Sequence, residues 1–320
     1  MLRQEKDRKM SLLAIVSVVA GIIIVLWGAD KFTDGASSLA LRMNIPPIVV
    51  GLTVVAFGTS APELFISLLS ALNGTSGMAI GNVVGSNIFN TLLIVGVSAA
   101  VAPIAIARGT VRKDIPFGLG ASLLFVALCL DGDVSRVDGI LLLAAFFLFM
   151  VYTLRLAKKD AANAGDTMAV KASMGKSILW VVLGLAMLVL GSQIFVKGAT
   201  LIAQMLGVSD AVIGLTIVAG GTSLPELATS VVSARKGQSA LAIGNVIGSN
   251  VFNVLMILGL TATISPLATA GITWVDYVLF VVSLALLWGM SYTRHRVSRW
   301  EGWLLVALFV SYIVWLIWNV

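Results

Sequence analysis

The sequence predicts an all-α integral membrane protein with ten transmembrane helices in two inverted five-helix repeats. The membrane assignment comes from composition, because 59% of the 320 residues are hydrophobic, 11% are charged and the mean hydropathy is +1.03. A water-soluble domain of this length needs far more polar surface. The helix count comes from ten apolar runs, and the division into halves comes from a sequence repeat.

The ten apolar runs are long enough, at about 20 residues each, to cross a bilayer. The first, residues 11–29, is long for a signal-peptide core and lacks a small-residue cleavage pattern, so we expect it to remain as a helix. The other runs lie at roughly 45–70, 78–101, 115–131, 137–155, 177–196, 208–234, 240–264, 274–291 and 301–319.

Residues 156–176 separate the fifth run from the sixth and are rich in Ala, Gly and Lys. This composition predicts a flexible linker. The expected domains are therefore a first five-helix repeat at 1–155, a linker at 156–176 and a second, inverted five-helix repeat at 177–320.

Each half carries the same two sequence blocks at an offset of 163 residues. The first block reads GLTVVAFGTSAPELFIS at 51–67 and GLTIVAGGTSLPELATS at 214–230. The second reads AIGNVVGSNIFNTLLIVG from Ala79 and AIGNVIGSNVFNVLMILG from Ala242. Because five helices per half is an odd number, the second copy enters the membrane in the opposite orientation. Inverted repeats of this kind are typical of secondary transporters.

The basic residues predict an orientation and exclude some partners. The net charge is +6, but the Lys and Arg residues fall between apolar runs as juxtamembrane anchors do, so we expect no nucleic-acid partner. With the amino terminus outside the cell membrane, most of the 21 Lys and Arg residues lie on the cytoplasmic side, together with the 156–176 loop. The amino-terminal tail argues locally for the opposite orientation through Arg3, Lys6, Arg8 and Lys9. A single cysteine, Cys129, excludes a disulfide framework and a thiolate metal site.

The first block places one glutamate, Glu63 or Glu226, inside apolar sequence in each half. A charge at the bilayer centre costs about 2.5–3.5 kcal/mol or more. No Lys or Arg lies within either acidic helix to neutralise it. Two such residues at matched positions of two halves indicate a transporter binding site.

The residues around each glutamate supply further oxygen ligands. Pro62 cannot donate a backbone hydrogen bond and so frees a carbonyl about four residues earlier. Thr59 and Ser60 share a helix face with Glu63 where helical geometry holds. The second half repeats the set as Thr222, Ser223, Pro225 and Glu226. An all-oxygen set suits hard cations such as Ca²⁺ and Na⁺.

The second block predicts a polar stripe on an apolar helix, because its polar residues recur at every fourth position as Asn82, Ser86 and Asn90, and again as Asn245, Ser249 and Asn253. For Asn82 and Asn245, interhelical hydrogen bonding and ion ligation remain equally open. Thr53 and Thr216 are expected to bond back to their own helix. The glycine pairs Gly81/Gly85 and Gly244/Gly248 favour close helix packing.

These doubled blocks resemble the two repeats of the sodium/calcium exchangers, prokaryotic type, within the calcium/cation antiporter superfamily. The resemblance covers essentially the whole chain and implies an ion site at mid-membrane. Carried over by position, it implies that these residues are ligands, the two alanines through their backbone carbonyls: Glu63, Glu226, Thr59, Thr222, Ser60, Ser223, Ser86, Ser249, Asn90, Asn253, Ala56 and Ala219.

Two positions within the resemblance bear on the coupling ion. Potassium-dependent exchangers carry an aspartate where this chain has Asn253, which favours potassium independence. Proton/calcium exchangers carry a further acid at the position of Gly85 and Gly248, which argues against proton coupling. Gly220 departs from the phenylalanine found at Phe57 in the first half.

The resulting expectation is a secondary antiporter that exchanges Na⁺ for Ca²⁺ by alternating access, and not an enzyme. Its expected partners are the two ions and the lipid bilayer, with no cofactor and no obligatory protein partner. The main alternative is a H⁺-coupled Ca²⁺/cation antiporter, and a more distant one is a passive cation channel. An intramembrane hydrolase is disfavoured because Ser60 lacks a base partner and the only histidine is His295.

Overall fold

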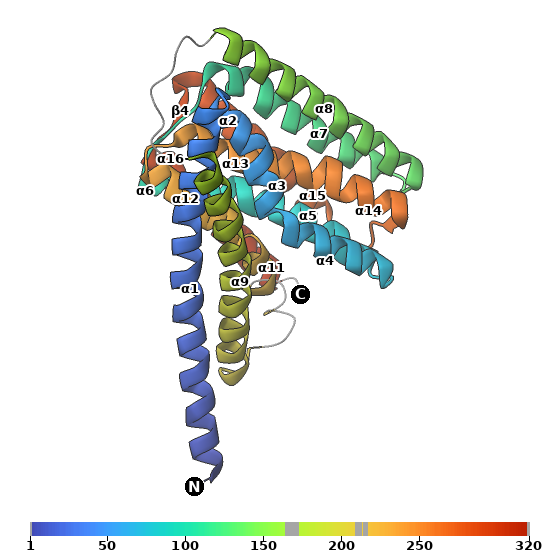
Figure 1. Ribbon diagram of the computed structural model, residues 1–320. Helices are drawn as coiled ribbons and strands as arrows, with labels where there is room; N and C mark the ends of the chain where they lie inside the picture. The colour runs from blue at the N-terminus through green and yellow to red at the C-terminus, as the bar shows by residue number, and fades with distance from the viewer. Residues whose placement is uncertain (1, 164–172, 209–212, 214–216, 319–320) are drawn as a thin grey trace.

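The computed structural model describes residues 2–163, 173–208, 213 and 217–318. The predicted all-α class is confirmed, since helices make up nearly all of this part of the chain (Figure 1). In the first half the helices are α1 (Leu2–Arg42), α2 (Pro47–Val50), η1 (Gly51–Val55), α3 (Ala56–Thr59), α4 (Ala61–Leu72), α5 (Ser76–Ile88), η2 (Phe89–Ile94), α6 (Val95–Val101), η3 (Thr110–Asp114), α7 (Ile115–Leu128) and α8 (Arg136–Asn163).

The described part of the second half follows the same order, except that α15 (Trp274–Arg294) takes the place of both η3 and α7. Its described helices are α9 (Met174–Met205), α11 (Ala219–Thr222), α12 (Leu224–Arg235), α13 (Ser239–Val251), η5 (Phe252–Leu258), α14 (Gly259–Ile264), α15 (Trp274–Arg294) and α16 (Arg299–Trp318). The starts of α11, α12, α13 and η5 lie 163 residues after those of α3, α4, α5 and η2, so equal sequence has produced equal local structure. The η segments are π-helical turns, which occur often at functional sites.

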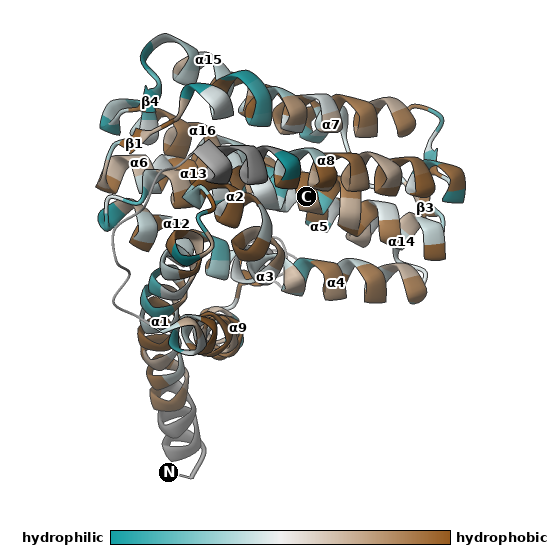
Figure 2. Cartoon of the chain, turned by 45° about the horizontal axis from the view of Figure 1, so that its top comes forward, coloured by the Kyte–Doolittle hydropathy of each residue, from teal (hydrophilic) through white to brown (hydrophobic). Residues whose placement is uncertain are grey.

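Seven helices in the described residues are long and apolar enough to cross a membrane, and an eighth is added if the bent pair of Pro47–Thr59 and Ala61–Leu72 counts as one span. This makes the chain a multi-pass membrane protein. Two of the ten predicted runs account for the difference. The run at 115–131 contains the 14-residue helix α7, and the run at 208–234 lies partly outside the described residues. Figure 2 shows hydrophobic residues along most helices, with hydrophilic residues mainly at their ends and in the connecting segments.

Helices extend into both ends of the predicted linker at 156–176. Helix α8 continues to Asn163 and helix α9 starts at Met174, where Ser173 accepts a hydrogen bond from the Lys176 backbone N–H. Alanine and lysine are good helix formers, so the stretch extends the flanking helix for two turns. The remainder of the predicted linker lies outside the described residues.

The helices α1 and α9 pack closely along their length and lie side by side in Figure 1. Glycines set the contact, since a Cβ on Gly21 would lie 2.6 Å from the Phe195 backbone nitrogen and one on Gly35 would lie 2.8 Å from the Ser177 carbonyl. Early residues of α1 therefore meet late residues of α9. The first helix of each half runs antiparallel to its counterpart.

Short strand pairs tie the two halves together at their ends. Strand β1 (Ile104–Ala105) pairs antiparallel with β4 (Arg296–Val297), and β2 (Asp133–Val134) pairs in the same way with β3 (Leu267–Ala268). Because β1 corresponds to β3 and β2 to β4, the two pairs are equivalent. Each pair joins one strand from each half.

The packing prediction for the repeated glycines is confirmed at Gly244 and Gly248. Gly244 lies against Gly51, and a Cβ on Gly248 would approach the Leu52 Cα to 2.7 Å. At Gly85 the packing prediction stays a prediction, because residue 215, which corresponds to Leu52 in the contact of Gly248, lies outside the described residues. At Gly81 the one contact, with the Ile272 side chain at 3.5 Å, is an ordinary one.

The α1–α9 contact predicts a strong effect of Gly184→Val. A Cβ there would lie 2.6 Å from the Phe32 backbone nitrogen, so the two helices have to separate. We expect the free energy of unfolding to fall by about 1–3 kcal/mol, as overpacking typically costs. Thermal unfolding in detergent measures it, with Gly120→Val as the control because no described atom lies within 4 Å of a Cβ at Gly120. Equal melting temperatures for the two variants would contradict this contact.

Candidate ion-binding site

The acidic blocks form two broken helices. Helix α3 ends at Thr59 and α4 starts at Ala61, with a bend of 47° between the two parts of the span. Pro62 lies in the first turn of α4, where a missing backbone N–H is tolerated. The same break separates α11 from α12 at Ser223, followed by Pro225. In both halves, therefore, the proline lies two residues after the break.

Each glutamate lies in the first turn of the helix that follows the break. The amino-terminal end of a helix carries partial positive charge and stabilises a carboxylate there. Both side chains are buried, with Glu63 and Glu226 each only 1% exposed. The break therefore places two carboxylates inside the protein at the end of a helix whose dipole favours them.

The carboxylates are held by serines from the opposite half. Ser60 Oγ donates to Glu226 Oε1 at 3.0 Å, and Ser223 Oγ donates to Glu63 Oε1 at 3.0 Å. Ser86 Oγ lies 3.4 Å from Ser223 Oγ, which brings α5 to the same place. The sequence predicted each of these residues, and the structure brings them together between the halves.

Several oxygens at this place have no hydrogen-bond donor among the described residues. They are buried and comprise Glu63 Oε2, Glu226 Oε2, Asn90 Oδ1, Asn253 Oδ1 and Ser249 Oγ. A buried polar atom without a partner costs about 1–3 kcal/mol, so each such atom calls for an explanation. Carboxylate, amide and hydroxyl oxygens are the ligands that hard cations prefer. The donor set fits Ca²⁺ or Na⁺.

Carboxylates alone do not complete such a site, since the described residues contain no group of three or more His, Cys, Asp or Glu that could hold a metal. The remaining predicted ligands lie on the same broken helices. Thr59 is buried and Thr222 is half-buried, and Ala56 and Ala219 begin α3 and α11. The Ala56 carbonyl accepts the Ser60 backbone N–H at 3.0 Å and a longer hydrogen bond from the Thr59 hydroxyl at 3.4 Å.

Asn82 and Asn245 tie neighbouring helices together. Asn245 Nδ2 donates to the Glu226 carbonyl at 3.3 Å and to Ser230 Oγ at 2.9 Å, and Asn245 Oδ1 accepts from Thr59 Oγ1 at 3.1 Å. Asn82 Nδ2 makes the matching bonds to the Glu63 carbonyl and to Ser67. Of the two open interpretations, the structure supports interhelical hydrogen bonding.

Two further asparagines were missed from the sequence. Asn253 Nδ2 donates to Asn87 Oδ1 at 2.9 Å, and Asn90 Nδ2 donates to Asn250 Oδ1 at 3.1 Å. The signal available was their place in the repeated G-S-N triplet. The two missed residues, Asn87 and Asn250, lie next to the stripe of polar residues at every fourth position. Nothing in the sequence distinguished them from asparagines that make ordinary contacts between helices.

Other acidic residues do not join the site. Asp30 pairs with Lys236 at 2.6 Å and Lys31 at 3.1 Å, and Lys236 also pairs with Asp34 at 2.7 Å. In the first turn of α8, Asp138 caps the helix by accepting from the Ser135 backbone N–H at 2.8 Å. These carboxylates stabilise helix contacts and a helix end.

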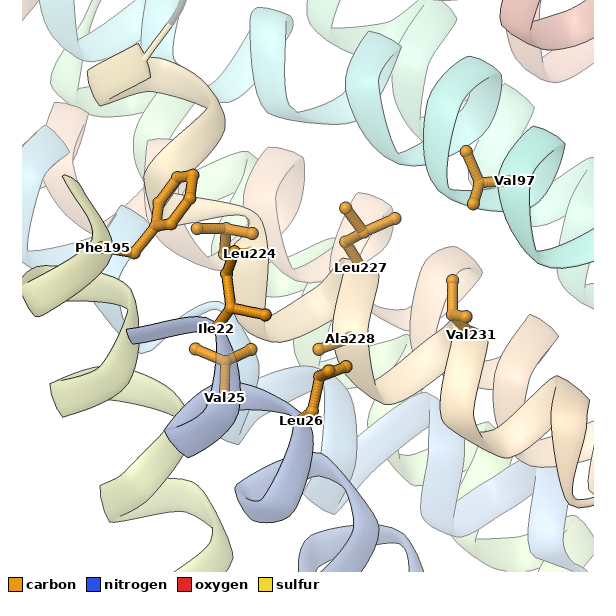
Figure 3. A pocket seen from close by; sticks show the side chains of 9 residues that line it. All are labelled: Ile22, Val25, Leu26, Val97, Phe195, Leu224, Leu227, Ala228 and Val231. Atoms are coloured by element: carbon orange, nitrogen blue, oxygen red, sulfur yellow. The ribbon is translucent and has the colours of Figure 1, made fainter. Parts of the chain in front are cut away.

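A separate cavity of about 250 Å³ is not an ion site (Figure 3). It lies between α1, α6, α9 and α12 and has only apolar lining side chains: Ile22, Val25, Leu26, Val97, Phe195, Leu224, Leu227, Ala228 and Val231. A cation requires oxygen ligands, and none of these side chains offers one. Helix α12 lines this cavity with Leu224 and Leu227, which precede and follow Glu226 in the sequence.

The asparagine ties predict different outcomes for two polar-to-apolar variants. Asn245→Leu leaves the Ser230 and Thr59 hydroxyls without their buried partner, so we expect the free energy of unfolding to fall by at least about 1–3 kcal/mol. Thr53→Val is the control, because the Thr53 hydroxyl donates only to Val49 O of its own helix at 2.7 Å, as predicted. Its effect should stay within about 0.5 kcal/mol. Thermal unfolding in detergent compares them, and an unaffected Asn245→Leu protein would argue against the tie.

Comparison with known proteins agrees with the paired architecture. The family model described as sodium/calcium exchanger protein matches residues 13–155 and 176–318, one match per half. The sodium/calcium exchanger MaX1 of Methanosarcina acetivorans is 32% identical, with 93% of this chain and 96% of MaX1 covered. Inner membrane protein YrbG of Escherichia coli is 34% identical, with 96% and 98% covered. The solved structure of the sodium-calcium exchanger NCX_Mj, soaked with Na⁺ and Sr²⁺, superposes with a TM-score of 0.84 at 31% identity, covering 95% of this chain and 98% of that one. The chain belongs to the sodium/calcium exchanger family.

Proposed function

We propose that the chain is a secondary antiporter that exchanges Na⁺ for Ca²⁺ at a site between its two halves. The observation that carries the proposal is the reciprocal pairing of Ser60 with Glu226 and of Ser223 with Glu63. Each carboxylate keeps its second oxygen buried without a donor among the described residues. A cation is the partner that both oxygens lack.

The proposed ligands come from both halves and include main-chain as well as side-chain oxygens. They are Glu63, Glu226, Thr59, Thr222, Ser60, Ser223, Ser86, Ser249, Asn90, Asn253, Ala56 and Ala219. Two ionised glutamates carry a charge of −2, which one Ca²⁺ neutralises. Several Na⁺ ions would occupy the same oxygens at wider spacing. A site that accepts one load or the other couples the two fluxes in opposite directions.

Alternating access requires the two halves to exchange roles. We propose ten spans in inverted repeats, with domains at 1–155 and 177–320, a cytoplasmic 156–176 loop and an external amino terminus. The antiparallel contact of α1 with its counterpart α9 supports the inversion, as does the equivalence of the two strand pairs. The α1–α9 pair would slide across the other helices to change access. No cofactor enters this scheme.

A carrier is favoured over a channel because both halves of one chain contribute a glutamate to the site. Channels usually build a selectivity filter symmetrically from several subunits. Here one chain supplies both glutamates, and packed helices bury them from both sides. The coupling ion is the open choice, because a glutamate can carry a proton as well as a metal.

Calcium uptake tests this function. We expect radiolabelled Ca²⁺ to enter Na⁺-loaded proteoliposomes when they are diluted into Na⁺-free medium, and not when Na⁺ is present on both sides. Glu63→Gln removes a charge from the site and should reduce uptake by about tenfold or more, corresponding to at least about 1.4 kcal/mol. Asp131→Asn is the matched control, because that carboxylate is exposed, and it should leave uptake unchanged.

The outcome distinguishes the alternatives. Uptake driven by a pH gradient and indifferent to Na⁺ would assign the chain to H⁺-coupled exchange. Uptake that requires no counter-ion would identify a passive channel.

The orientation has its own test. In a Cys129→Ser background, a membrane-impermeant maleimide applied to intact cells should label Gln4→Cys and leave Ala161→Cys unlabelled. Cys129 is buried, which limits its interference in any variant that retains it. Permeabilised cells provide the control, because both cysteines should react there. Labelling of Ala161→Cys in intact cells would show that the 156–176 loop lies outside and would contradict the proposed orientation.

A further inference from the structure

We propose that Asn87 is a positioning residue of the ion site, which locks the amide of Asn253 so that its oxygen is presented to the cation. This inference rests on the proposed function and concerns how one of its ligands is oriented. Asparagine amides have an oxygen at one end and an NH₂ at the other, with nearly the same shape. Hydrogen-bond partners alone decide which end faces a site.

The two ends of the Asn253 amide have different surroundings. Nδ2 donates to Asn87 Oδ1 at 2.9 Å, and Oδ1 is buried without a donor among the described residues. Asn253 lies in η5, one turn beyond Ser249, whose Oγ is likewise buried without a described partner. The Asn253 Oδ1 atom is therefore available to an ion. The Asn253 NH₂ group, which would repel a cation, is held by its hydrogen bond to Asn87.

Asn87 is itself held in one orientation. Its Nδ2 donates to the main-chain carbonyl of Asn250 at 3.0 Å. A main-chain carbonyl only accepts, so turning the Asn87 amide over would place two oxygens face to face. The chain of contacts from the Asn250 carbonyl through Asn87 to Asn253 thus has one allowed direction.

The equivalent chain in the other half lacks this lock. Asn90 Nδ2 donates to Asn250 Oδ1, and Asn250 Nδ2 donates to Thr91 Oγ1 at 2.8 Å. A hydroxyl both donates and accepts, so the Asn250 and Asn90 amides can reverse together without losing their bonds. The residue equivalent to Thr91 is Val254, which offers no hydroxyl, and Asn87 uses a carbonyl instead.

A double-mutant cycle tests the lock. Asn87→Leu frees the Asn253 amide to turn its NH₂ toward the site, and we expect the apparent Ca²⁺ affinity to fall by about 10- to 100-fold, as the loss of an outer-shell partner typically does. In an Asn253→Ala background there is no amide to orient, so Asn87→Leu should then lower the apparent Ca²⁺ affinity by less than about twofold. Residues that act through one another are non-additive in this way, whereas a merely structural role gives equal losses in both backgrounds.

Two readouts separate this inference from the proposed function. Ca²⁺ affinity is measured on purified protein in detergent, from the Ca²⁺ concentration that gives half-maximal thermal stabilisation, and Na⁺-driven uptake is measured on the same four proteins. If Asn87→Leu does not fold, Asn87→Ala enters the same cycle. Equal losses in both backgrounds, or no loss with Asn253 intact, would overturn the lock. If the unmodified protein binds Ca²⁺ but shows no Na⁺-driven uptake, the proposed exchange function is wrong. The double-mutant cycle in Ca²⁺ affinity still tests the role of Asn87 in that case.

Discussion

Two carboxylates buried in an apolar helix bundle impose the constraint that the rest of this structure satisfies. An isolated ionised carboxylate is expensive to remove from water unless it is hydrogen-bonded or paired. Glu63 and Glu226 are both 1% exposed, and each obtains a serine hydroxyl and a position in the first turn of a helix. These contacts stabilise one oxygen of each group. The second oxygen remains available, which is what a reversible ion site requires.

The constraint also explains why the two halves depend on each other. Each glutamate receives its hydroxyl from the opposite half, and the asparagine contacts across α5 and α13 cross in the same way. Neither half supplies the serine hydroxyl for its own carboxylate. Both glutamates therefore obtain this partner only when the two halves are packed together.

The fold class and the centre of the site could be predicted because their signals are local and repeated. Apolar composition, proline after the break and a glutamate in each half require no knowledge of packing. The roles of Asn82 and Asn87 could not be predicted in this way. Both are asparagines on the same apolar helix, yet Asn82 bonds to Ser67 on α4 and Asn87 accepts from Asn253 on η5. Which helix lies opposite each side chain is decided by tertiary packing.

The aromatic side chains around the repeated blocks differ between two equivalent positions. The Phe252 ring packs 4.9 Å from Phe146 and 5.9 Å from Phe57, and Phe57 and Phe252 lie beside Ser60. At the equivalent position the Phe89 ring packs 5.3 Å from Phe309, but Gly220 takes the place of the third ring. The two positions therefore repeat the same sequence block but differ in the side chains that pack around it.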